Sequence, residues 1–396
     1  HIPPMPPDRD YIHATLAELV RINSINPAFG AGDSSEAVVA SRVESLLAEM
    51  GARTTTMEFA PGRASVVGRF PGSGGGRSLM LYGHLDTVGV SGMEDPFSAA
   101  VQDGRMYGRG SYDMKGGLTA CLAAARMLAK GESLAGDLYV VAVADEETES
   151  RGMQLLLEEG LRTAGAIVTE ATELDLGVAH KGFCWIEIVT EGRAAHGSRP
   201  EEGVDANTMM GRVLVALEQE TTRIAAGRRH PLLGAGSQHV GTIQGGSGPS
   251  IYAARCRIEL ERRLIPGESA DGAMADVNRL LTALGAADST FKASARLLLD
   301  RPSFEQDPDS PLVRAVHSAA TAVRGQAPAV IGHSYWMDAS LLKAVGVETV
   351  MIGPAGTGAH AEIEYVELDS VVRLAEILAR AARFYSGGAA PPRNVV

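Results

Sequence analysis

The chain has 396 residues, of which 45% are hydrophobic and 21% charged, a composition typical of a globular protein large enough for two domains. Its formal net charge is −12, and the sequence contains no basic patch of the kind that binds nucleic acid or an anionic membrane. Aromatic residues make up only 5%, which argues against base stacking and against an aromatic sugar-binding platform.

The first part of the chain alternates between helical and strand patterns. Apolar residues in helical spacing predict helices, and short apolar runs bounded by glycines predict strands. The expected helices are 14–20, 35–50, 116–129 and 152–159, and the expected strands are 54–60, 64–70, 78–83, 137–144 and 164–171. The glycine-rich segment 71–77 is interpreted as a hairpin connector between two of these strands.

The pattern changes near residue 183 to the order β-α-β-β-α-β, which suits a four-stranded antiparallel sheet with two helices on one face. Its strands are expected at 184–192, 239–246, 254–265 and 289–299, and its helices at 205–220 and 269–284. Helices at 312–323, 340–344 and 369–385 and a strand at 348–352 follow. We therefore expect an α/β domain with a mixed sheet and helices on both faces, formed by 1–182 and 299–396 and interrupted by an α+β domain at 183–298.

Three cysteines, Cys121, Cys184 and Cys256, lie far apart and form no C-x-x-C pair. This usage argues against a disulfide framework and favours a reducing compartment. No apolar run reaches the length of a membrane span, and the first residues lack the hydrophobic core of a secretory signal. We expect a cytoplasmic protein without nucleic-acid or membrane partners.

Imidazole and carboxylate side chains follow the ends of several predicted strands of the larger domain. Ligands in open α/β sheets bind outside the carboxyl ends of the strands, so these side chains should share one edge. They are His84, Asp86, Asp113, Glu146, Glu147, Glu170 and His360. Nitrogen and oxygen donors without thiolates suit Zn²⁺, Co²⁺ or Mn²⁺. With one carboxylate shared, the set suffices for two metal ions about 3.5–4 Å apart.

Glu146 and Glu147 are adjacent, which suggests a division of labour. One carboxylate can bind metal while the other takes a proton from water, because like charges near cations separate in pKa. Each residue alone is a weak signal, since a lone histidine is more often structural and an acidic run after a strand is often a solvated turn.

Eight motifs occur together between about residues 80 and 366. They are GHLDTV, GRGSYDMKGG, ADEETES, TEAT, HKG, AAHGSRPEEGVDA, ERRLIPGE and GAHAEIEY. On these motifs the chain resembles the metal-dependent family that contains acetylornithine deacetylase, succinyl-diaminopimelate desuccinylase, aminoacylase and the glutamate carboxypeptidases. ADEET and AHKG are most similar to the acetylornithine deacetylase branch.

The resemblance implies roles for the matching positions. His84 and Glu170 would bind one divalent ion, expected to be Zn²⁺ with Co²⁺ or Mn²⁺ as alternatives. Glu147 and His360 would bind a second ion, and Asp113 would bridge the two, followed by a cis peptide bond to Met114.

The resemblance also implies that Asp86 hydrogen-bonds His84 and fixes its tautomer. Glu146 would be the general base, which deprotonates water and then protonates the leaving amine.

The inserted domain matches the family's lid and dimerisation domain. There His196 would reach the active site of a partner subunit in a homodimer and stabilise the oxyanion; an exposed loop histidine is the plainer reading. Arg263 would grip a substrate carboxylate, unless it simply pairs with Glu261 on the strand surface. Ser250 stands where the family usually has a substrate-contacting Asn, so substrate anchoring should differ.

Two aromatic residues, Tyr335 and Trp336, precede Asp338 and are unusual in so aromatic-poor a chain. They suggest a pocket wall, although plain core packing explains them equally well. The expected activity is hydrolysis of the amide bond of N-acyl amino acids or related small carboxylated amides. The alternatives are an exopeptidase or dipeptidase, an amidohydrolase acting on an unusual amine, and a non-catalytic metal-binding scaffold.

Overall fold

The computed structural model describes residues 6–30 and 36–387. It divides the chain into two compact units, which are described separately. The first contains His1–Val178, Gln306–Ile331 and Met337–Val396, and the second contains Ala179–Glu305 and Gly332–Trp336.

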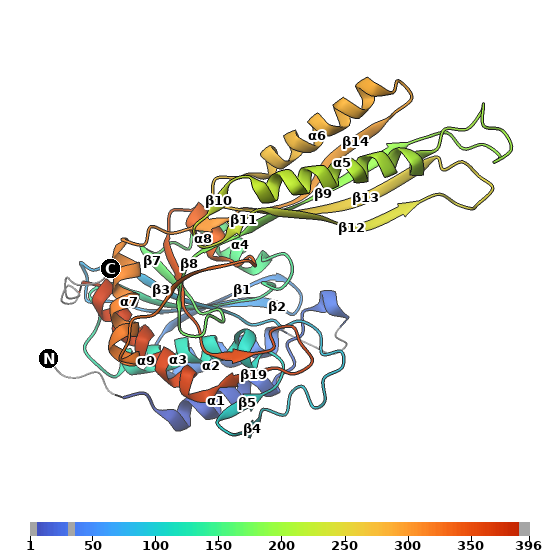
Figure 1. Ribbon diagram of the computed structural model, residues 1–396. Helices are drawn as coiled ribbons and strands as arrows, with labels where there is room; N and C mark the ends of the chain where they lie inside the picture. Colours follow the sequence, from blue (N-terminus) through green and yellow to red (C-terminus); the bar gives the residue numbers. More distant parts are fainter. Residues whose placement is uncertain (1–5, 31–35, 388–396) are drawn as a thin grey trace. The chain divides into compact units, whose positions relative to one another are not determined.

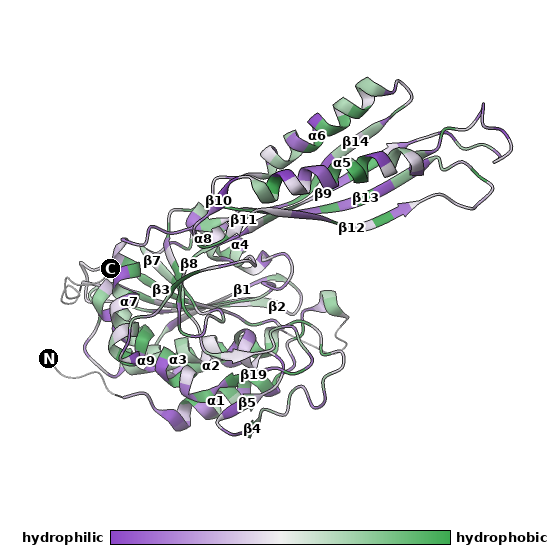
Figure 2. Ribbon diagram, in the orientation of Figure 1, coloured by the Kyte–Doolittle hydropathy of each residue, from purple (hydrophilic) through white to green (hydrophobic). Residues whose placement is uncertain are grey.

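A mixed β-sheet forms the centre of the first unit, in the order β1-β2-β6-β3-β7-β17-β8 (Figure 1). Its strands are β1 (Arg53–Ala60), β2 (Arg63–Phe70), β3 (Leu79–His84), β6 (Leu138–Val143), β7 (Gly165–Val168), β8 (Leu176–His180) and β17 (Glu348–Met351). The central strands β6, β3, β7 and β17 are parallel. Parallel strands are buried on both faces, and Figure 2 shows the middle of this sheet predominantly green.

The expectation of a hairpin at 71–77 is wrong. Strands β2 and β3 are not neighbours, because β6 lies between them and pairs antiparallel with β2 and parallel with β3. The glycine-rich segment therefore lies against the start of β6, a strand that comes some 60 residues later in the chain. Its glycines allow this close approach, because a Cβ on Gly76 would lie 2.4 Å from the backbone nitrogen of Gly136, just before β6.

Helices cover both faces of this sheet, with α1, α2, α3 and α9 below it in Figure 1 and α4 and α8 above it. The helices of the unit are α1 (Arg9–Arg21), α2 (Glu36–Glu49), α3 (Gly116–Ala129), α4 (Arg151–Glu158), α7 (Pro311–Arg324), α8 (Ala339–Ala344) and α9 (Leu368–Tyr385), with a short 3₁₀ turn at Pro27–Phe29. Helix α3 consists mainly of glycine, alanine and leucine, so it packs closely against α9 and α1. Among the described residues, none of the helices has the length and apolarity needed to cross a membrane.

A second, small sheet in the first unit has the order β18-β19-β5-β4. Its strands are β4 (Ala100–Gln102), β5 (Arg105–Tyr107), β18 (Gly356–Thr357) and β19 (Tyr365–Glu367). These strands are only two or three residues long, and the sequence did not predict them. Their pairing joins the segment before Asp113 to the segment that contains His360.

The second unit is a four-stranded antiparallel sheet in the order β12-β13-β9-β14. Its main elements are β9 (Gly182–Glu191), α5 (Ala206–Ala226), β12 (Ser237–Gly245), β13 (Arg255–Leu264), α6 (Ala270–Ala287) and β14 (Ala293–Arg301). The short strands β10 (Arg229–His230) and β11 (Gly234–Ala235) pair with each other, and β15 (Phe304–Glu305) pairs with the end of β8; β16 spans Val330–His333.

Side chains of β9 alternate between the two faces of this sheet. Ile186 and Ile188 are buried in a core with residues of α5 and α6, whereas Trp185 on the other face is 44% exposed. Both helices therefore lie on one face, as Figure 1 shows. The expected fold class, a mixed α/β sheet with a separate α+β sheet and two helices, is confirmed.

Candidate metal centre

The predicted ligands of the first unit lie at one edge of its central sheet. His84 ends β3, Glu146 and Glu147 follow β6, and Glu170 follows β7. Because β3, β6 and β7 are parallel neighbours, their carboxyl ends bring these side chains together.

Helix α3 places a further carboxylate, Asp113, in the turn directly before its first residue. The helix lies so close to β7 that a Cβ on Gly117 would be 2.1 Å from the carbonyl oxygen of Thr169, beside Glu170. The peptide bond between Asp113 and Met114 is cis, as expected.

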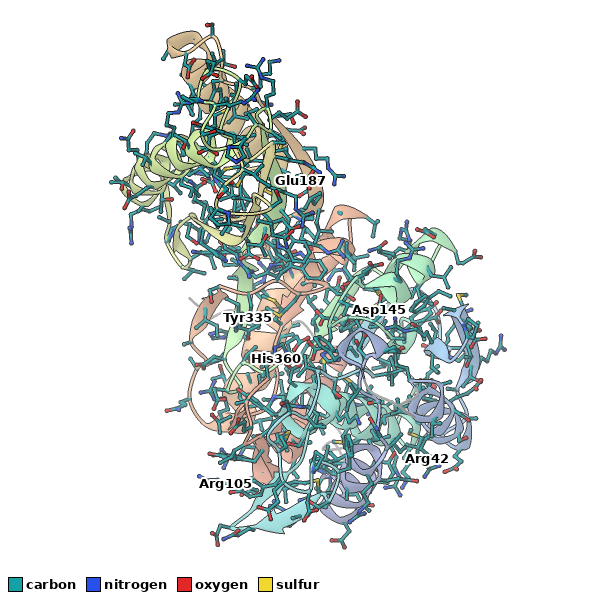
Figure 3. All side chains as sticks on the ribbon, turned by 90° about the vertical axis from the view of Figure 1, so that its right-hand side faces the viewer. Arg42, Arg105, Asp145, Glu187, Tyr335 and His360 are labelled. Carbon is teal, nitrogen blue, oxygen red and sulfur yellow. The ribbon has the colours of Figure 1, made fainter. Side chains whose placement is uncertain are left out.

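Asp113 lies between two imidazoles. Its Oδ1 is 3.1 Å from Nε2 of His84, and its Oδ2 is 3.2 Å from Nε2 of His360 (labelled in Figure 3). Glu170 approaches the same His84 nitrogen to 3.6 Å, and Glu147 approaches the same His360 nitrogen to 3.0 Å. Asp113 thus contacts two imidazoles, each of which also approaches one glutamate.

These donors fit divalent metal ions. One donor atom each from His84, Asp113 and Glu147 lie within 4.8 Å of one another, and the same holds for His84, Glu146 and Glu170. Glu147 Oε1 is buried and has no hydrogen-bond partner, which is costly for a carboxylate unless a cation accepts its lone pairs. Two imidazoles and several carboxylates without a thiolate are the donors that Zn²⁺, Co²⁺ and Mn²⁺ accept.

The charges of the cluster are mutually dependent. Hydrogen bonds to Asp113 and Glu147 raise the pKa of His360 to about 10. Burial opposes ionisation of Asp113, but the hydrogen bonds from the two histidines outweigh it and hold the pKa of its carboxyl well below the usual range. Burial and the Asp113 charge raise the pKa of Glu147 to about 7 and that of Glu170 to about 8. Nearby cations reverse such shifts in carboxylates, so this crowding also favours metal binding.

A model of the peptidase family M20/M25/M40 matches residues 80–383. The chain belongs to this family. It is 32% identical over 326 residues to acetylornithine deacetylase of Myxococcus xanthus, covering 80% of this chain and 83% of the relative. Membership confirms the resemblance seen in the motifs, and the chain is a metal-dependent hydrolase of C–N bonds.

Solved structures agree with the fold of the family. Aminopeptidase PepT from Bacillus cereus superposes with a TM-score of 0.78 at 17% identity, covering 95% of this chain and 99% of that chain. A dinuclear metal-binding peptidase of family M20 from Bacillus subtilis gives a TM-score of 0.73 at 14% identity, covering 94% and 97%.

In this M20 chain the ring of His84 is oriented by the backbone carbonyl of Asp86, whereas the Asp86 carboxylate was expected to orient it. Nδ1 of His84 lies 2.9 Å from the backbone carbonyl oxygen of Asp86, while the Asp86 carboxylate is 3.7 Å away. That carboxylate instead accepts the backbone N–H groups of Glu146 and Glu147, each at 3.1 Å. Asp86 therefore holds the segment that carries the proposed base and a ligand.

A carboxylate oxygen of Glu146 lies within 4.8 Å of donor atoms of His84 and Glu170. Burial, together with the charges of Glu170 and Asp338, raises the pKa of Glu146 well above its usual value. A carboxylate with a raised pKa is a stronger base, which favours its taking a proton from water.

A buried ion pair that the sequence did not predict stabilises the loops on the His360 side. Arg109 Nη1 donates to Glu364 at 2.6 Å, and both side chains are almost completely buried. The other carboxylate oxygen of Glu364 accepts the backbone N–H groups of Tyr112 and Asp113, and Arg109 also donates to the carbonyl oxygen of Ala361, next to His360. The GAHAEIEY motif includes Glu364, so its position in the motif was the available signal.

The predicted substrate residues lie in the second unit. His196 is exposed, its Nδ1 is 2.8 Å from Ser198 Oγ, and its backbone bridges to Ile251, next to Ser250. Arg263 donates to Glu261 at 2.8 Å, at the far end of β13 from residue 251. The ten residues of that strand span roughly 30 Å, so one copy of this unit cannot place Arg263 and His196 on the same small ligand.

The aromatic pair near residue 335 also lies in the second unit. Trp336 donates its indole N–H to the carbonyl oxygen of Pro302 at 3.1 Å, and its ring is 6.5 Å from that of Phe183. Arg301 lies over the same indole, 5.2 Å from its centroid, while Tyr335 is 43% exposed. Trp336 therefore packs against its own unit.

Proposed function

We propose that this M20 enzyme hydrolyses the amide bond of N-acyl amino acids or related small carboxylated amides, using two divalent metal ions. The observation that supports it is that Asp113 contacts both His84 and His360, which in turn approach Glu170 and Glu147. Glu146 lies beside His84 and Glu170. The similarity to acetylornithine deacetylase of Myxococcus xanthus supports a small acylated amino acid as substrate.

In the proposed mechanism His84 and Glu170 would hold one ion and Glu147 and His360 would hold the other, with Asp113 available to both. When bound, two such ions would supply Lewis-acid chemistry that polarises the substrate carbonyl and lowers the pKa of water. Glu146 takes a proton from the attacking water as its oxygen bonds to the carbonyl carbon. Glu146 then gives that proton to the amine nitrogen as the C–N bond breaks.

The lid residues have proposed roles in substrate binding. His196 donates a hydrogen bond to the oxyanion, and Arg263 or Ser250 contacts the carboxylated end of the substrate. Since His196 and Arg263 lie at opposite ends of their sheet, we propose that His196 serves the active site of a second subunit in a homodimer. Arg263 must then leave its hydrogen bond with Glu261 to bind substrate.

A panel of N-acetyl, N-formyl and N-succinyl amino acids, compared with dipeptides, tests the substrate class by the release of free amine from metal-loaded protein. Cleavage of acylated amino acids is expected; cleavage of dipeptides alone makes the enzyme an exopeptidase, and cleavage of neither contradicts the proposal.

The variant Glu146→Gln tests the proposed base. It keeps the size of the side chain and should lower kcat by about 10²–10⁴-fold with metal content unchanged. Glu149→Gln, in the same acidic run but exposed, is the matched control. Near-normal turnover of the metal-loaded Glu146→Gln variant would rule out this role.

A further inference from the structure

A buried polar network lies behind the segment that carries Glu146 and Glu147. We call it the Asn26 network, and its members are Asn26, Glu36, Arg63, Asp86 and Asp145. All except Arg63 are at most 2% exposed. Asn26, Glu36 and Arg63 precede residue 80, outside the part of the chain that matches the family model.

Asn26 links the two aspartates of this network. Its Nδ2 lies 2.9 Å from Oδ2 of Asp86 and 3.1 Å from Oδ1 of Asp145, and it also reaches Thr148 Oγ1 at 3.1 Å. Asp86 in turn accepts the backbone N–H groups of Glu146 and Glu147. One amide group therefore connects to both residues through a single intervening carboxylate.

Arg63 and Glu36 fix the residue immediately before Glu146, which is Asp145 (labelled in Figure 3). Arg63 donates to Asp145 at 2.6 Å and to Glu36 at 2.5 Å, and Glu36 accepts the backbone N–H of Asp145 at 2.8 Å. The φ of Asp145 is +73°, a left-handed conformation that a non-glycine residue adopts only when its surroundings hold it there.

The charges of this network make the Asn26 amide important. The network contains three buried carboxylates, on Glu36, Asp86 and Asp145, and one guanidinium, that of Arg63, which pairs with Glu36 and Asp145. Buried charges need hydrogen-bond donors to offset their lost hydration, and Asn26 supplies donors without adding a charge.

We propose that Asn26 is a positioning residue for the metal centre: through Asp86 and Asp145 it sets where Glu147 binds metal and where Glu146 accepts its proton, with Arg63 and Glu36 in support. This inference rests on the proposed function, because it concerns the metal affinity and the general base of the proposed centre.

Asn26 has a second contact that provides the alternative explanation. Its Oδ1 accepts the backbone N–H of Ala28 and caps the short turn Pro27–Phe29. Asn26→Asp keeps this capping oxygen but removes both amide N–H donors and places a third carboxylate against Asp86 and Asp145. Asn26→Ala removes both functions. A capping role predicts that Asn26→Asp is harmless, whereas the positioning role predicts that it is at least as damaging as Asn26→Ala.

The experiment is calorimetric titration of metal-free protein with Zn²⁺, together with kcat, KM and the melting temperature of the metal-free protein. Both variants should bind Zn²⁺ about 10–100-fold more weakly, with kcat lowered and KM nearly unchanged. Asn23→Ala is the matched control, since Asn23 lies in the same loop and its side chain accepts the local N–H of Ile25.

Wild-type Zn²⁺ affinity and kcat in Asn26→Asp overturn the inference, as does a loss of melting temperature alone. If Asn26→Asp does not fold, Arg63→Lys provides the second measurement, because it keeps the charge but loses the forked contact with Glu36 and Asp145. Weaker Zn²⁺ binding by that variant supports the inference, and unchanged binding overturns it. A wild-type protein that binds no metal instead defeats the proposed function.

Discussion

The buried pair of Arg109 and Glu364 provides a quantitative test of how the first unit holds its metal ligands. The variant Arg109→Met keeps an unbranched side chain but removes the guanidinium. Glu364 then keeps its two backbone donors and loses the guanidinium that balances its charge. The carbonyl oxygens of Gly89 and Ala361 lose their donor as well.

The expected loss follows from the burial of this pair. The side chains of Arg109 and Glu364 are 3% and 0% exposed, so removing one partner leaves an uncompensated buried charge. This should lower the unfolding free energy of the first unit by about 3–5 kcal/mol. The double variant Arg109→Met/Glu364→Gln removes both charges and keeps an oxygen for the two backbone N–H groups. Its loss should fall short of the sum of the two single losses by about 0.5–3 kcal/mol.

Amide hydrogen exchange of peptides from α3 and α9 measures this loss in the first unit. Tryptophan fluorescence cannot replace it, because both tryptophans, Trp185 and Trp336, lie in the second unit. Fluorescence therefore provides an internal control that should not change. Arg126→Met is the matched variant, since its pair with Asp8 is partly exposed and should be worth at most about 1 kcal/mol. A loss similar to that of Arg126→Met, or additive losses in the double variant, would refute the reasoning.

Two further predictions concern pH and subunit exchange. In metal-free protein the raised pKa values of Glu147 (about 7), Glu170 (about 8) and His360 (about 10) all favour the protonated folded state, so their contribution to stability is lost as pH rises through these values. The melting temperature measured with chelator should therefore decrease from about pH 6 to pH 9. Added Zn²⁺ should raise the melting temperature more at the alkaline end of this range, where its ligands are deprotonated. A chelated protein whose melting temperature increases across this range contradicts the assignment. If His196 acts across a dimer, mixing and refolding inactive Glu146→Gln and His196→Ala chains should restore part of the activity, since mixed dimers contain one complete site. No recovery in dimers shown to be mixed argues for action within one chain.

Several elements could be predicted because their local pattern is strong. Helix α3 has the predicted bounds, since small and apolar residues predominate from Gly116 to Ala129, with Arg126 as the one charged residue. Strand β13 could be predicted because buried and more exposed side chains alternate along it. Helix α1 starts five residues earlier than predicted, at Arg9, although Asp8 caps its first turn and was an available signal.

Long-range pairing could not be predicted. The error at 71–77 arose because nothing in that segment reveals that β6 will lie between β2 and β3. The small sheet was missed because strands of two or three residues have no periodicity to detect.

The same reason separates the proposed ligands, which the sequence could indicate, from the residues that support them. His84 and His360 stand within recognisable motifs, so the sequence could indicate them. Asn26 and Arg63 lie in segments without a motif and reach their partners across 60 to 119 positions of the chain. Such contacts depend on the folded sheet and leave no local pattern.

The division of the first unit into separated segments has a consequence for how the protein is made. His360 follows Glu170 by 190 positions, and the second unit is encoded almost entirely between them. At roughly 5–20 residues per second, the ribosome needs about 10–40 seconds to add that stretch. Throughout this interval the nascent chain displays His84, Asp113, Glu147 and Glu170 without the second imidazole. The complete set of proposed metal donors exists only after this stretch has been added.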